Sequence, residues 1–257
     1  MKNIFFMLSL FMVLFSLSAK ESMTFICEDK EDYPFVMGNG KDFNNDKPGV
    51  VVELLKIVEN KMGVEFVFSR TPWKRALEVE LKEGNVDGLF SASYKKEREE
   101  MGVYPNINGV VDPSKKLYRI AYSYYQLKSS PVDWDGKELK GFNGKIGAPR
   151  GYSIVSDLRS KGYTVEESDG CEYDLKKLQL NRVQLTAELD LQAENILNKN
   201  PELAKDIVKV TPPIVEKDYY LMLSFKFVEN NKELADKFWK NLEEVRNAEL
   251  EKIMEKY

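Results

Sequence analysis

Strand-like and helix-like segments alternate along almost the whole of this sequence. Apolar residues recur at helical spacing between residues 51 and 62, and Gly63 then ends the predicted helix. Residues 64–68 alternate between apolar and polar side chains, as a half-buried strand does. Thr71 and Pro72 supply an N-cap and a proline at the first position of a second helix. This alternation predicts an α/β protein.

The rest of the chain continues the pattern, with glycines and prolines at many of the boundaries. We find no tandem repeat and no low-complexity segment. Further strands are predicted at residues 23–27, 117–127, 145–148, 163–166, 183–188, 207–210 and 219–225, and further helices at 73–81, 154–161, 175–180, 189–198 and 234–253. A chain of 257 residues has room for one large domain or for two lobes.

The N-terminus, residues 1–19, has the features of a secretory signal peptide. Lys2 precedes an apolar run from residue 4 to residue 17, and small residues lead up to Ala19. The run is shorter than the ~20 residues that a membrane span needs. Cys27 lies in a strand-like segment and does not directly follow the run, so we expect no lipid anchor. We predict cleavage near Ala19 and a soluble, periplasmic mature protein; a retained anchor helix is the alternative.

The composition excludes several kinds of chemistry. The net charge is −4 and becomes one unit more negative when Lys2 is removed with the signal peptide. This mild acidity argues against nucleic-acid binding, which needs a basic surface. Because the sequence has no histidine, Ser-His-Asp and Cys-His catalysis and histidine-ligated metal sites are excluded. Two cysteines, Cys27 and Cys171, are too few for a zinc site, and we expect no cofactor and no metal. Whether they form a disulfide stays open.

Residues 84–98 are the most informative local segment. A short apolar strand ends at Ser91 and Ser93, and a polar loop then leads past Arg98 into a predicted helix. In an open α/β sheet the strand ends border the ligand crevice. An arginine fork can donate two parallel hydrogen bonds to a carboxylate, and hydroxyl groups can add others. We therefore predict a site for a small carboxylate-bearing solute. Alternatively, Arg98 lies on a solvated helix face and the serines only cap that helix.

A second segment with anion-binding features is Gly151-Tyr152-Ser153. It follows the predicted strand at 145–148 and opens the predicted helix at 154–161. The first N–H groups of a helix have no partner within the helix, so they favour an anion.

The chain resembles the family 3 extracellular solute-binding proteins, which supply polar amino acids to ABC importers. The resemblance extends over nearly the whole mature chain. Each motif is weak by itself, and it is their order and spacing that indicate the family. The residues that carry it are Tyr33-Pro34-Phe35, Pro48-Gly49-Val50, Asn85-Val86-Asp87-Gly88, Ser91-Ala92-Ser93 with Arg98, Lys145-Ile146-Gly147 with Gly151, and the C-terminal helix ending at Tyr257.

The resemblance implies a two-lobed α/β fold of the periplasmic binding protein type. Two crossing strands would form the hinge, and the ligand cleft would lie between the lobes. Lobe 1 would contain residues 20–119 and 220–257, and lobe 2 would contain residues 120–219.

The resemblance also implies roles for single residues. Arg98 would clamp the ligand carboxylate, with Ser91 and Ser93 beside it. The amides of the turn at residues 151–153 in lobe 2 would contact the same carboxylate.

Aromatic and basic residues near this site are further candidates. Trp73 matches an apolar position against which the ligand packs, and Tyr33 or Asp32 falls near the aromatic wall of the family's site. Trp73 and Tyr33 could equally be core residues. Arg75 would face either the cleft or the solvent.

One position departs from the family's pattern. The family usually has an aspartate in lobe 2, seven residues after an arginine, that holds the ligand's α-ammonium group. Arg182 matches that arginine, but the residue seven positions on is Leu189. Either Glu188 or Asp190 takes the role, or the ligand lacks an α-ammonium group; both acids could also lie on the surface.

Three kinds of function fit these features. The first, which we predict, is a monomeric secreted binding protein that captures a carboxylate-bearing solute by hinge closure. The solute that we favour is a polar amino acid. The partner would be the membrane permease of an ABC importer. The second is a periplasmic enzyme similar to cyclohexadienyl dehydratases, with Glu188 as the acid. The third is a ligand-sensing subunit for a separate membrane receptor.

Overall fold

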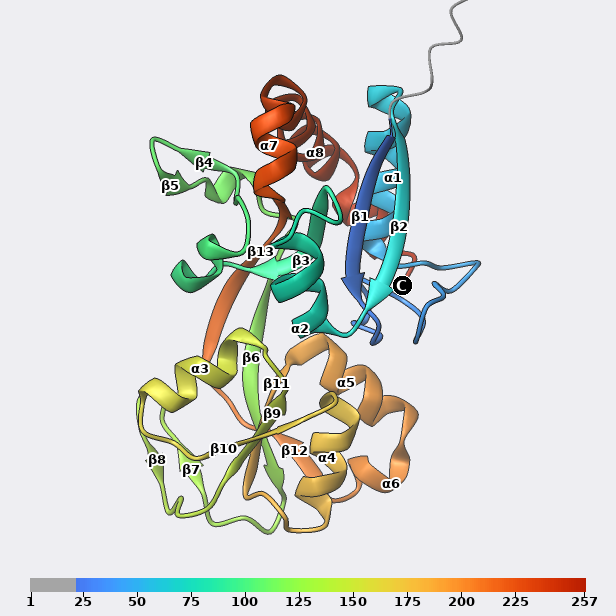
Figure 1. Cartoon of the computed structure of the whole chain (residues 1–257). Helices are drawn as coiled ribbons and strands as arrows, with labels where there is room; N and C mark the ends of the chain where they lie inside the picture. The colour runs from blue at the N-terminus through green and yellow to red at the C-terminus, as the bar shows by residue number, and fades with distance from the viewer. Residues whose placement is uncertain (1–21) are drawn as a thin grey trace, which may run out of the picture.

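The computed structural model describes residues 22–257 and shows two lobes joined by two long strands (Figure 1). This confirms the predicted two-lobed α/β fold. The predicted signal peptide, residues 1–19, lies outside the described residues. From residue 22 onward, no helix combines the length and the apolar character that a membrane crossing needs.

Two crossing strands run through both lobes and pair with each other in antiparallel fashion. They are β6 (Tyr118–Leu127) and β13 (Val215–Leu223). Residues 118–122 of β6 lie opposite residues 215–219 of β13. This pairing joins the sheets of the two lobes into one continuous curled sheet. The lobe boundaries predicted after residues 119 and 219 fall inside these two strands.

Lobe 1, the upper lobe in Figure 1, contributes the strand order β13-β3-β1-β2. Here β1 is parallel to β2 and to β3, whereas β13 is antiparallel to β3. The elements of lobe 1 are β1 (Ser22–Glu28), α1 (Val50–Met62), β2 (Glu65–Thr71), α2 (Trp73–Arg75), η1 (Ala76–Leu81), β3 (Gly88–Ser93), η2 (Lys96–Glu100), β4 (Asn106–Ile107), β5 (Val110–Val111), η3 (Pro113–Lys115), α7 (Phe225–Asn230) and α8 (Lys232–Met254).

Lobe 2 contributes the strand order β10-β9-β11-β6, and β12 also pairs with β6. The elements of lobe 2 are β7 (Asp133–Trp134), β8 (Leu139–Lys140), β9 (Ile146–Pro149), α3 (Ser153–Ser160), β10 (Val165–Ser168), α4 (Cys171–Gln179), β11 (Leu185–Leu189), α5 (Asp190–Lys199), α6 (Pro201–Ala204) and β12 (Ile207–Lys209).

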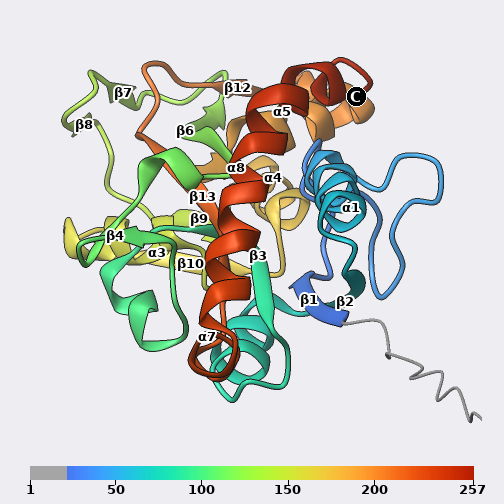
Figure 2. The same cartoon turned by 90° about the horizontal axis from the view of Figure 1, so that it is seen from above.

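The lobe 1 sheet is buried on both faces, so neighbouring side chains belong to different apolar layers. Phe25 and Phe90 pack in the layer that contains α1 and α8, which lie side by side (Figure 2). Ile26 and Leu89 pack in the other layer, together with Trp73. This second layer holds the helix start at Trp73 against the ends of β1 and β3, where the pocket described below lies.

In lobe 2 every residue of β9 and β11 is buried. Apolar residues of α3 pack with Ala187 on one face of β11, whereas Cys171 and Leu175 of α4 belong to a separate apolar cluster. Because side chains alternate along a strand, Glu188 and Leu189 point to opposite faces. This alternation decides which of the two residues reaches the space between the lobes.

Two predicted helices differ from the observed elements. The helix predicted at 73–81 begins as the short α2 and continues as η1, a π-helix. The helix predicted after the polar loop is only η2, a 3-10 segment of five residues that contains Arg98. Gly102 and Pro105 follow it closely and leave no room for a longer helix.

Candidate functional site

A pocket lies between the two lobes beside the crossing strands, and residues of both lobes line it. Its volume is only about 30 Å³, enough for about two water molecules, because the lobes contact each other directly. In this arrangement of the lobes the pocket has no room for a larger solute. The lining residues are Cys27, Glu28, Lys30, Asp32, Val36, Trp73, Phe90, Ser91, Ser93, Arg98, Tyr122, Tyr152, Ser153, Leu189 and Tyr219.

Arg98 is buried in this pocket, with 7% of its surface exposed, and connects the two lobes. Its Nη1 donates to the carbonyl and hydroxyl oxygens of Ser93, each at 2.9 Å. Its Nη2 donates to the carbonyl oxygen of Gly151 in lobe 2 at 3.2 Å. The guanidinium also lies over the ring of Trp73, 5.1 Å from the centroid. Arg98 is thus not on a solvated helix face.

A pair of hydroxyl groups from opposite lobes lies beside Arg98. Ser93, the last residue of β3, donates to the hydroxyl oxygen of Ser153 at 2.9 Å. Lys217 of the crossing strand β13 donates to the same oxygen at 2.8 Å. Ser153 is the first residue of α3, and the first N–H groups of a helix have no partner within it. The pocket therefore lies between an arginine of lobe 1 and a helix N-terminus of lobe 2.

The turn at Gly151 meets lobe 1 through its carbonyl group. Gly151 has a φ of +73°, in the left-handed region that favours glycine. Its carbonyl oxygen accepts from Arg98 and, at 3.2 Å, from the indole Nε1 of Trp73. Its N–H donates to the carboxylate of Glu167 at 2.8 Å. The backbone N–H of Gly151 was expected to face a solute, but it is already hydrogen-bonded to Glu167.

Ser91 lines the pocket in an unusual backbone conformation. Its φ is +66°, which residues other than glycine rarely adopt. Its hydroxyl oxygen is buried and has no hydrogen-bond partner within residues 22–257. Backbone strain of this kind clusters at functional sites, and a hydroxyl group without a partner is free to bond with a solute.

Trp73 and Arg75, two residues apart, have different surroundings. Trp73 is 6% exposed, packs in the second apolar layer of lobe 1 and also lines the pocket. Trp73 is therefore both a core residue of lobe 1 and a pocket residue. The side chain of Arg75 is 65% exposed, and its Nε donates to Glu80 at 2.8 Å. Arg75 does not line the pocket.

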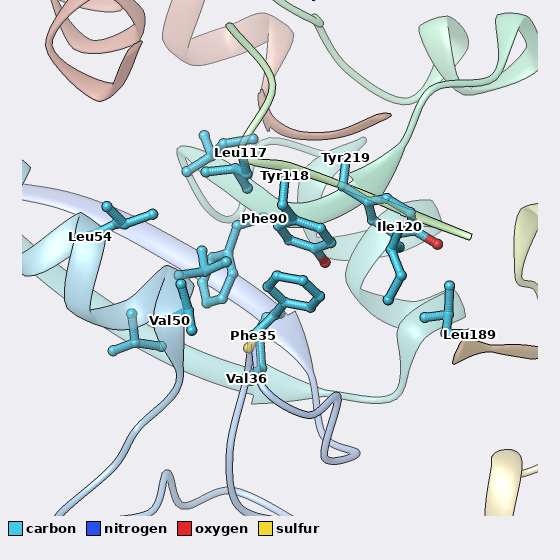
Figure 3. Packing of buried hydrophobic residues seen from close by; sticks show 14 of the residues in the cluster. Phe35, Val36, Val50, Leu54, Phe90, Leu117, Tyr118, Ile120, Leu189 and Tyr219 are labelled. Carbon is cyan, nitrogen blue, oxygen red and sulfur yellow. The ribbon is translucent and has the colours of Figure 1, made fainter. Parts of the chain in front are cut away.

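Four aromatic residues on the crossing strands and on the segment after β1 pack together beside the pocket, and we call this group the aromatic floor: Phe35, Tyr118, Tyr122 and Tyr219. Of the four, Tyr122 and Tyr219 line the pocket. Tyr118 stacks on Phe35 and on Tyr219, with ring centroids 3.5 Å and 5.0 Å apart (Figure 3). The hydroxyl groups of Tyr122 and Tyr219 are 2.8 Å apart. Of these rings, those of Tyr122 and Tyr219 are the ones that a solute in the pocket could contact.

Two carboxyl groups of lobe 1 also line the pocket. Glu28, the last residue of β1, accepts a hydrogen bond from the hydroxyl of Tyr152 in lobe 2 at 2.5 Å. Burial raises the pKa of Glu28 to about 8, and the nearby Asp32 and Asp29 add to the effect. Burial also raises the pKa of Asp32 to about 7, against the opposing effect of a hydrogen bond from Tyr118. Both groups can thus change their charge near neutral pH.

Besides Arg75 and Gly151, three predicted site residues do not line the pocket. The hydroxyl of Tyr33 donates to the backbone carbonyl of Tyr257 at 2.5 Å. Asp190 forms an ion pair with Lys209 at 2.5 Å. Glu188 is fully buried inside lobe 2. The residue of β11 that reaches the pocket is Leu189, so no lobe 2 carboxylate lies where the family's aspartate would be.

Cys27 and Cys171 are buried free thiols, so the structure does not contain the disulfide that the sequence left open. Cys27 lines the pocket, whereas Cys171 belongs to the apolar cluster of lobe 2. Burial raises the pKa of both thiols.

The sequence prediction missed Glu28 and the tyrosines of the aromatic floor. The rule that located Ser93 could have located Glu28, because β1 and β3 are parallel neighbours whose carboxyl ends meet at one edge. Tyr122 and Tyr219 carried a weaker signal, since they lie in the strands that the resemblance implied would cross between the lobes.

Comparisons with known proteins agree with this architecture. The family model described as bacterial extracellular solute-binding proteins, family 3, matches residues 26–257. A comparison with curated proteins gave no match.

Several solved structures share the fold. A histidine kinase sensor domain with similarity to periplasmic binding proteins has a TM-score of 0.75 and 18% identity, covering 93% of this chain and 96% of that one. An arginine 3rd transport system periplasmic binding protein from Legionella pneumophila has a TM-score of 0.72 and 16% identity, covering 93% and 100%. The GluR0 ligand-binding core from Nostoc punctiforme, in complex with L-glutamate, has a TM-score of 0.69 and 16% identity, covering 91% and 98%. At such identities these likenesses show the fold alone.

Proposed function

Since the chain belongs to family 3 of the bacterial extracellular solute-binding proteins, we propose that it captures a small carboxylate-bearing solute between its lobes and delivers it to an ABC importer. The single observation that supports the carboxylate is Arg98, a buried arginine in a pocket that both lobes line. A polar amino acid is the solute class that the family suggests. The sequence favours a periplasmic, monomeric protein whose partner is the membrane permease.

The contacts of Arg98 suggest how the carboxylate would bind. The Gly151 carbonyl oxygen, which accepts from Nη2, occupies a place at the guanidinium that a carboxylate oxygen could take. The carboxylate would carry a full negative charge and make a stronger, charge-assisted hydrogen bond than the carbonyl. The N-terminus of α3, beginning at Ser153, would approach the same anion from lobe 2. One ligand group would thus connect the lobes and favour the closed form through its higher affinity for it.

The dehydratase alternative required Glu188 as an acid in the cleft. Because Glu188 lies in the interior of lobe 2 and not at the pocket, this alternative loses the residue on which it depended. The sensor alternative has the same ligand chemistry and differs only in its partner. A binding assay with the purified permease would separate it from the importer proposal.

The proposal is tested by replacing Arg98. Arg98→Ala should fold normally, because the Ser93 carbonyl keeps its hydrogen bond from Tyr104 at 2.7 Å. Binding should weaken by about 2–5 kcal/mol, the cost of leaving a buried carboxylate without its partner. Arg98→Lys should restore only part of this, since an ammonium group cannot form the forked pair.

The measurement is calorimetry with the solute identified by mass spectrometry of small molecules released from the purified protein. Arg75→Ala is the matched control, because it removes an arginine near the site that does not line the pocket. Affinity of the folded Arg98→Ala protein within a few-fold of wild type would contradict the carboxylate proposal.

A further inference from the structure

Arg70, near the end of β2, is a buried arginine whose hydrogen bonds go to backbone oxygens. It is 6% exposed. Its Nε donates to the carbonyl oxygen of Glu28 and its Nη2 to that of Lys30, both at 3.0 Å. Its Nη1 donates to the carbonyl oxygens of Asp42 at 2.8 Å and of Met37 at 3.3 Å. One guanidinium thus connects four points of the chain that follows β1.

The charge of Arg70 is met by dipoles and not by a carboxylate. Among residues 22–257, the arginines that form ion pairs are Arg75, Arg119, Arg150 and Arg159. Besides the four carbonyl groups, the guanidinium of Arg70 has the ring of Phe43, 4.9 Å away at its centroid. A buried charge is costly unless its hydrogen bonds are made, so the four oxygens must keep their positions around it. Arg70 therefore favours one conformation of the chain that supplies them.

That part of the chain is the β1–α1 loop, residues 29–49, and it forms part of the pocket. It contains no helix, and its only strand pairing is one isolated bridge. Lys30 and Asp32 of the loop line the pocket. The loop also meets lobe 2, because Gln192 of α5 donates to the carbonyl oxygen of Glu31 at 2.6 Å. Without regular secondary structure, the loop depends on its few anchors for the shape that it presents to the pocket and to lobe 2.

We propose that Arg70 is a positioning residue for solute binding, which holds the β1–α1 loop in the form that completes the pocket and contacts lobe 2. The inference rests on the proposed function and adds to it a residue that acts through the loop, since Arg70 itself does not line the pocket. A loop that is already ordered lowers the entropy that binding must offset. If the loop held its binding-competent form for only a tenth of the time, the apparent affinity would fall about tenfold.

The experiment compares two replacements of Arg70 with a control that lowers stability elsewhere. Arg70→Met keeps a long side chain and removes every donor, whereas Arg70→Lys keeps the charge but not the planar fork that reaches four oxygens. Leu242→Ala is the control, because it removes buried packing from α8 of the same lobe and its side chain does not line the pocket. Urea unfolding gives the stability of each variant. Calorimetric titration with the twenty protein L-amino acids, under conditions where the variants are folded, gives the affinity.

A second measurement needs no solute. Hydrogen exchange of backbone amides reports how often each segment opens. In Arg70→Met the amides of residues 29–49 should exchange at least about tenfold faster than in the wild type, because their opening no longer breaks the bonds to the guanidinium. In Leu242→Ala the same amides should keep nearly the wild-type rate relative to the rest of lobe 1. This comparison separates a loosened loop from a generally weakened lobe.

For the amino acid that the wild type binds most tightly, we expect a loss of affinity of at least about tenfold in Arg70→Met and at least about threefold in Arg70→Lys. Leu242→Ala should change the affinity less than about twofold although it is less stable. Affinity within about twofold of wild type in either folded Arg70 variant, or an equal loss in Leu242→Ala, would overturn the inference. If Arg98→Ala still lost binding, the proposed function would stand. Binding that needs Arg70 but survives Arg98→Ala would support the role of the loop and overturn the carboxylate clamp.

Discussion

At the scale of single residues, Glu188 is the clearest case of an ionisable group kept away from water. Both of its carboxylate oxygens are buried and lack hydrogen-bond partners among residues 22–257. Burial raises the pKa of this carboxyl well above its usual range, and the nearby Asp174 adds to the effect. The folded protein therefore holds the proton more tightly than the unfolded chain does.

This arrangement predicts the pH dependence of stability. The contribution of Glu188 to the free energy of unfolding should fall as the pH rises above about 4, where the unfolded chain releases the proton that Glu188 retains in the folded state. Glu188→Gln should reduce the loss of stability between pH 5 and pH 8 by at least about 1 kcal/mol, because the glutamine stays neutral. Urea unfolding at both pH values measures this. Glu172→Gln, an exposed change on α4, is the control and should leave the wild-type slope intact.

Glu188→Gln also tests whether Glu188 belongs to the binding site. Glu188→Gln should bind solute as the wild type does, because the side chain does not line the pocket. The sequence could not decide whether Glu188, Asp190 or neither of them reaches the cleft. The strand was predicted correctly, but which of its faces points to the cleft depends on the packing of α3 and α4 around β11. Long-range packing of this kind leaves no local signal in the sequence.

At the scale of elements, the start of α1 depends on a close approach that only glycine allows. Gly49 immediately precedes the helix and has a φ of +111°. A Cβ atom at this position would lie 2.4 Å from the carbonyl oxygen of Phe35, a backbone atom that cannot easily move. The N–H of Val51 donates to the same oxygen at 3.1 Å, and this hydrogen bond connects the start of α1 to the segment that carries Asp32 and Phe35.

Gly49→Ala should therefore destabilise the protein more than the matched change at the other end of the helix. Gly63 also has a positive φ, +70°, but a Cβ atom there would meet no other atom within 4 Å. We expect Gly63→Ala to cost about 1 kcal/mol from backbone strain alone and Gly49→Ala to cost ~2–4 kcal/mol. Chemical unfolding of the two variants gives the comparison. Equal losses of stability in the two variants would show that the backbone near Phe35 can shift to make room for the Cβ atom without a cost in free energy.

Most elements could be predicted because their signals are local. The spacing of apolar residues from 51 to 62 and the glycine that follows define α1, and alternation defines β2. The π-helical η1 and the short η2 could not be predicted in this way. Their form depends on how Leu77 and Arg98 are held by other parts of the chain, in the second apolar layer and across the pocket. Arg98 could be proposed as a site residue without knowing the helix length, because an arginine close to the end of a strand is well placed to bind an anion in the crevice.

At the scale of the whole molecule, one tryptophan should report the separation of the lobes. Trp73 of lobe 1 donates from Nε1 to Gly151 of lobe 2. The other two tryptophans donate within their own lobes, Trp134 to Pro212 at 2.8 Å and Trp239 to Leu221 at 3.1 Å. Of the three indoles, we expect only that of Trp73 to change its hydrogen-bond partner and its contact with water if the lobes move apart.

Addition of the solute identified by mass spectrometry should therefore change the tryptophan emission of the wild type. Trp73→Phe should lose this change, and Trp134→Phe should keep it. The measurement is a fluorescence titration of the three proteins at the same concentration. An emission change that persists in Trp73→Phe would mean that solute binding alters the interior of a lobe instead of the distance between lobes.

The pairing of β6 with β13 has a consequence for the order in which contacts form. Five residue pairs, from Tyr118 with Tyr219 to Tyr122 with Val215, keep the two strands in register. Tyr122 and Tyr219 therefore keep their positions while the parts of the lobes far from these strands move most. An arriving solute can meet the tyrosines and Arg98 before Ser153 closes over it. We expect the groups of lobe 1 to govern how fast the solute arrives and those of lobe 2 to govern how long it stays.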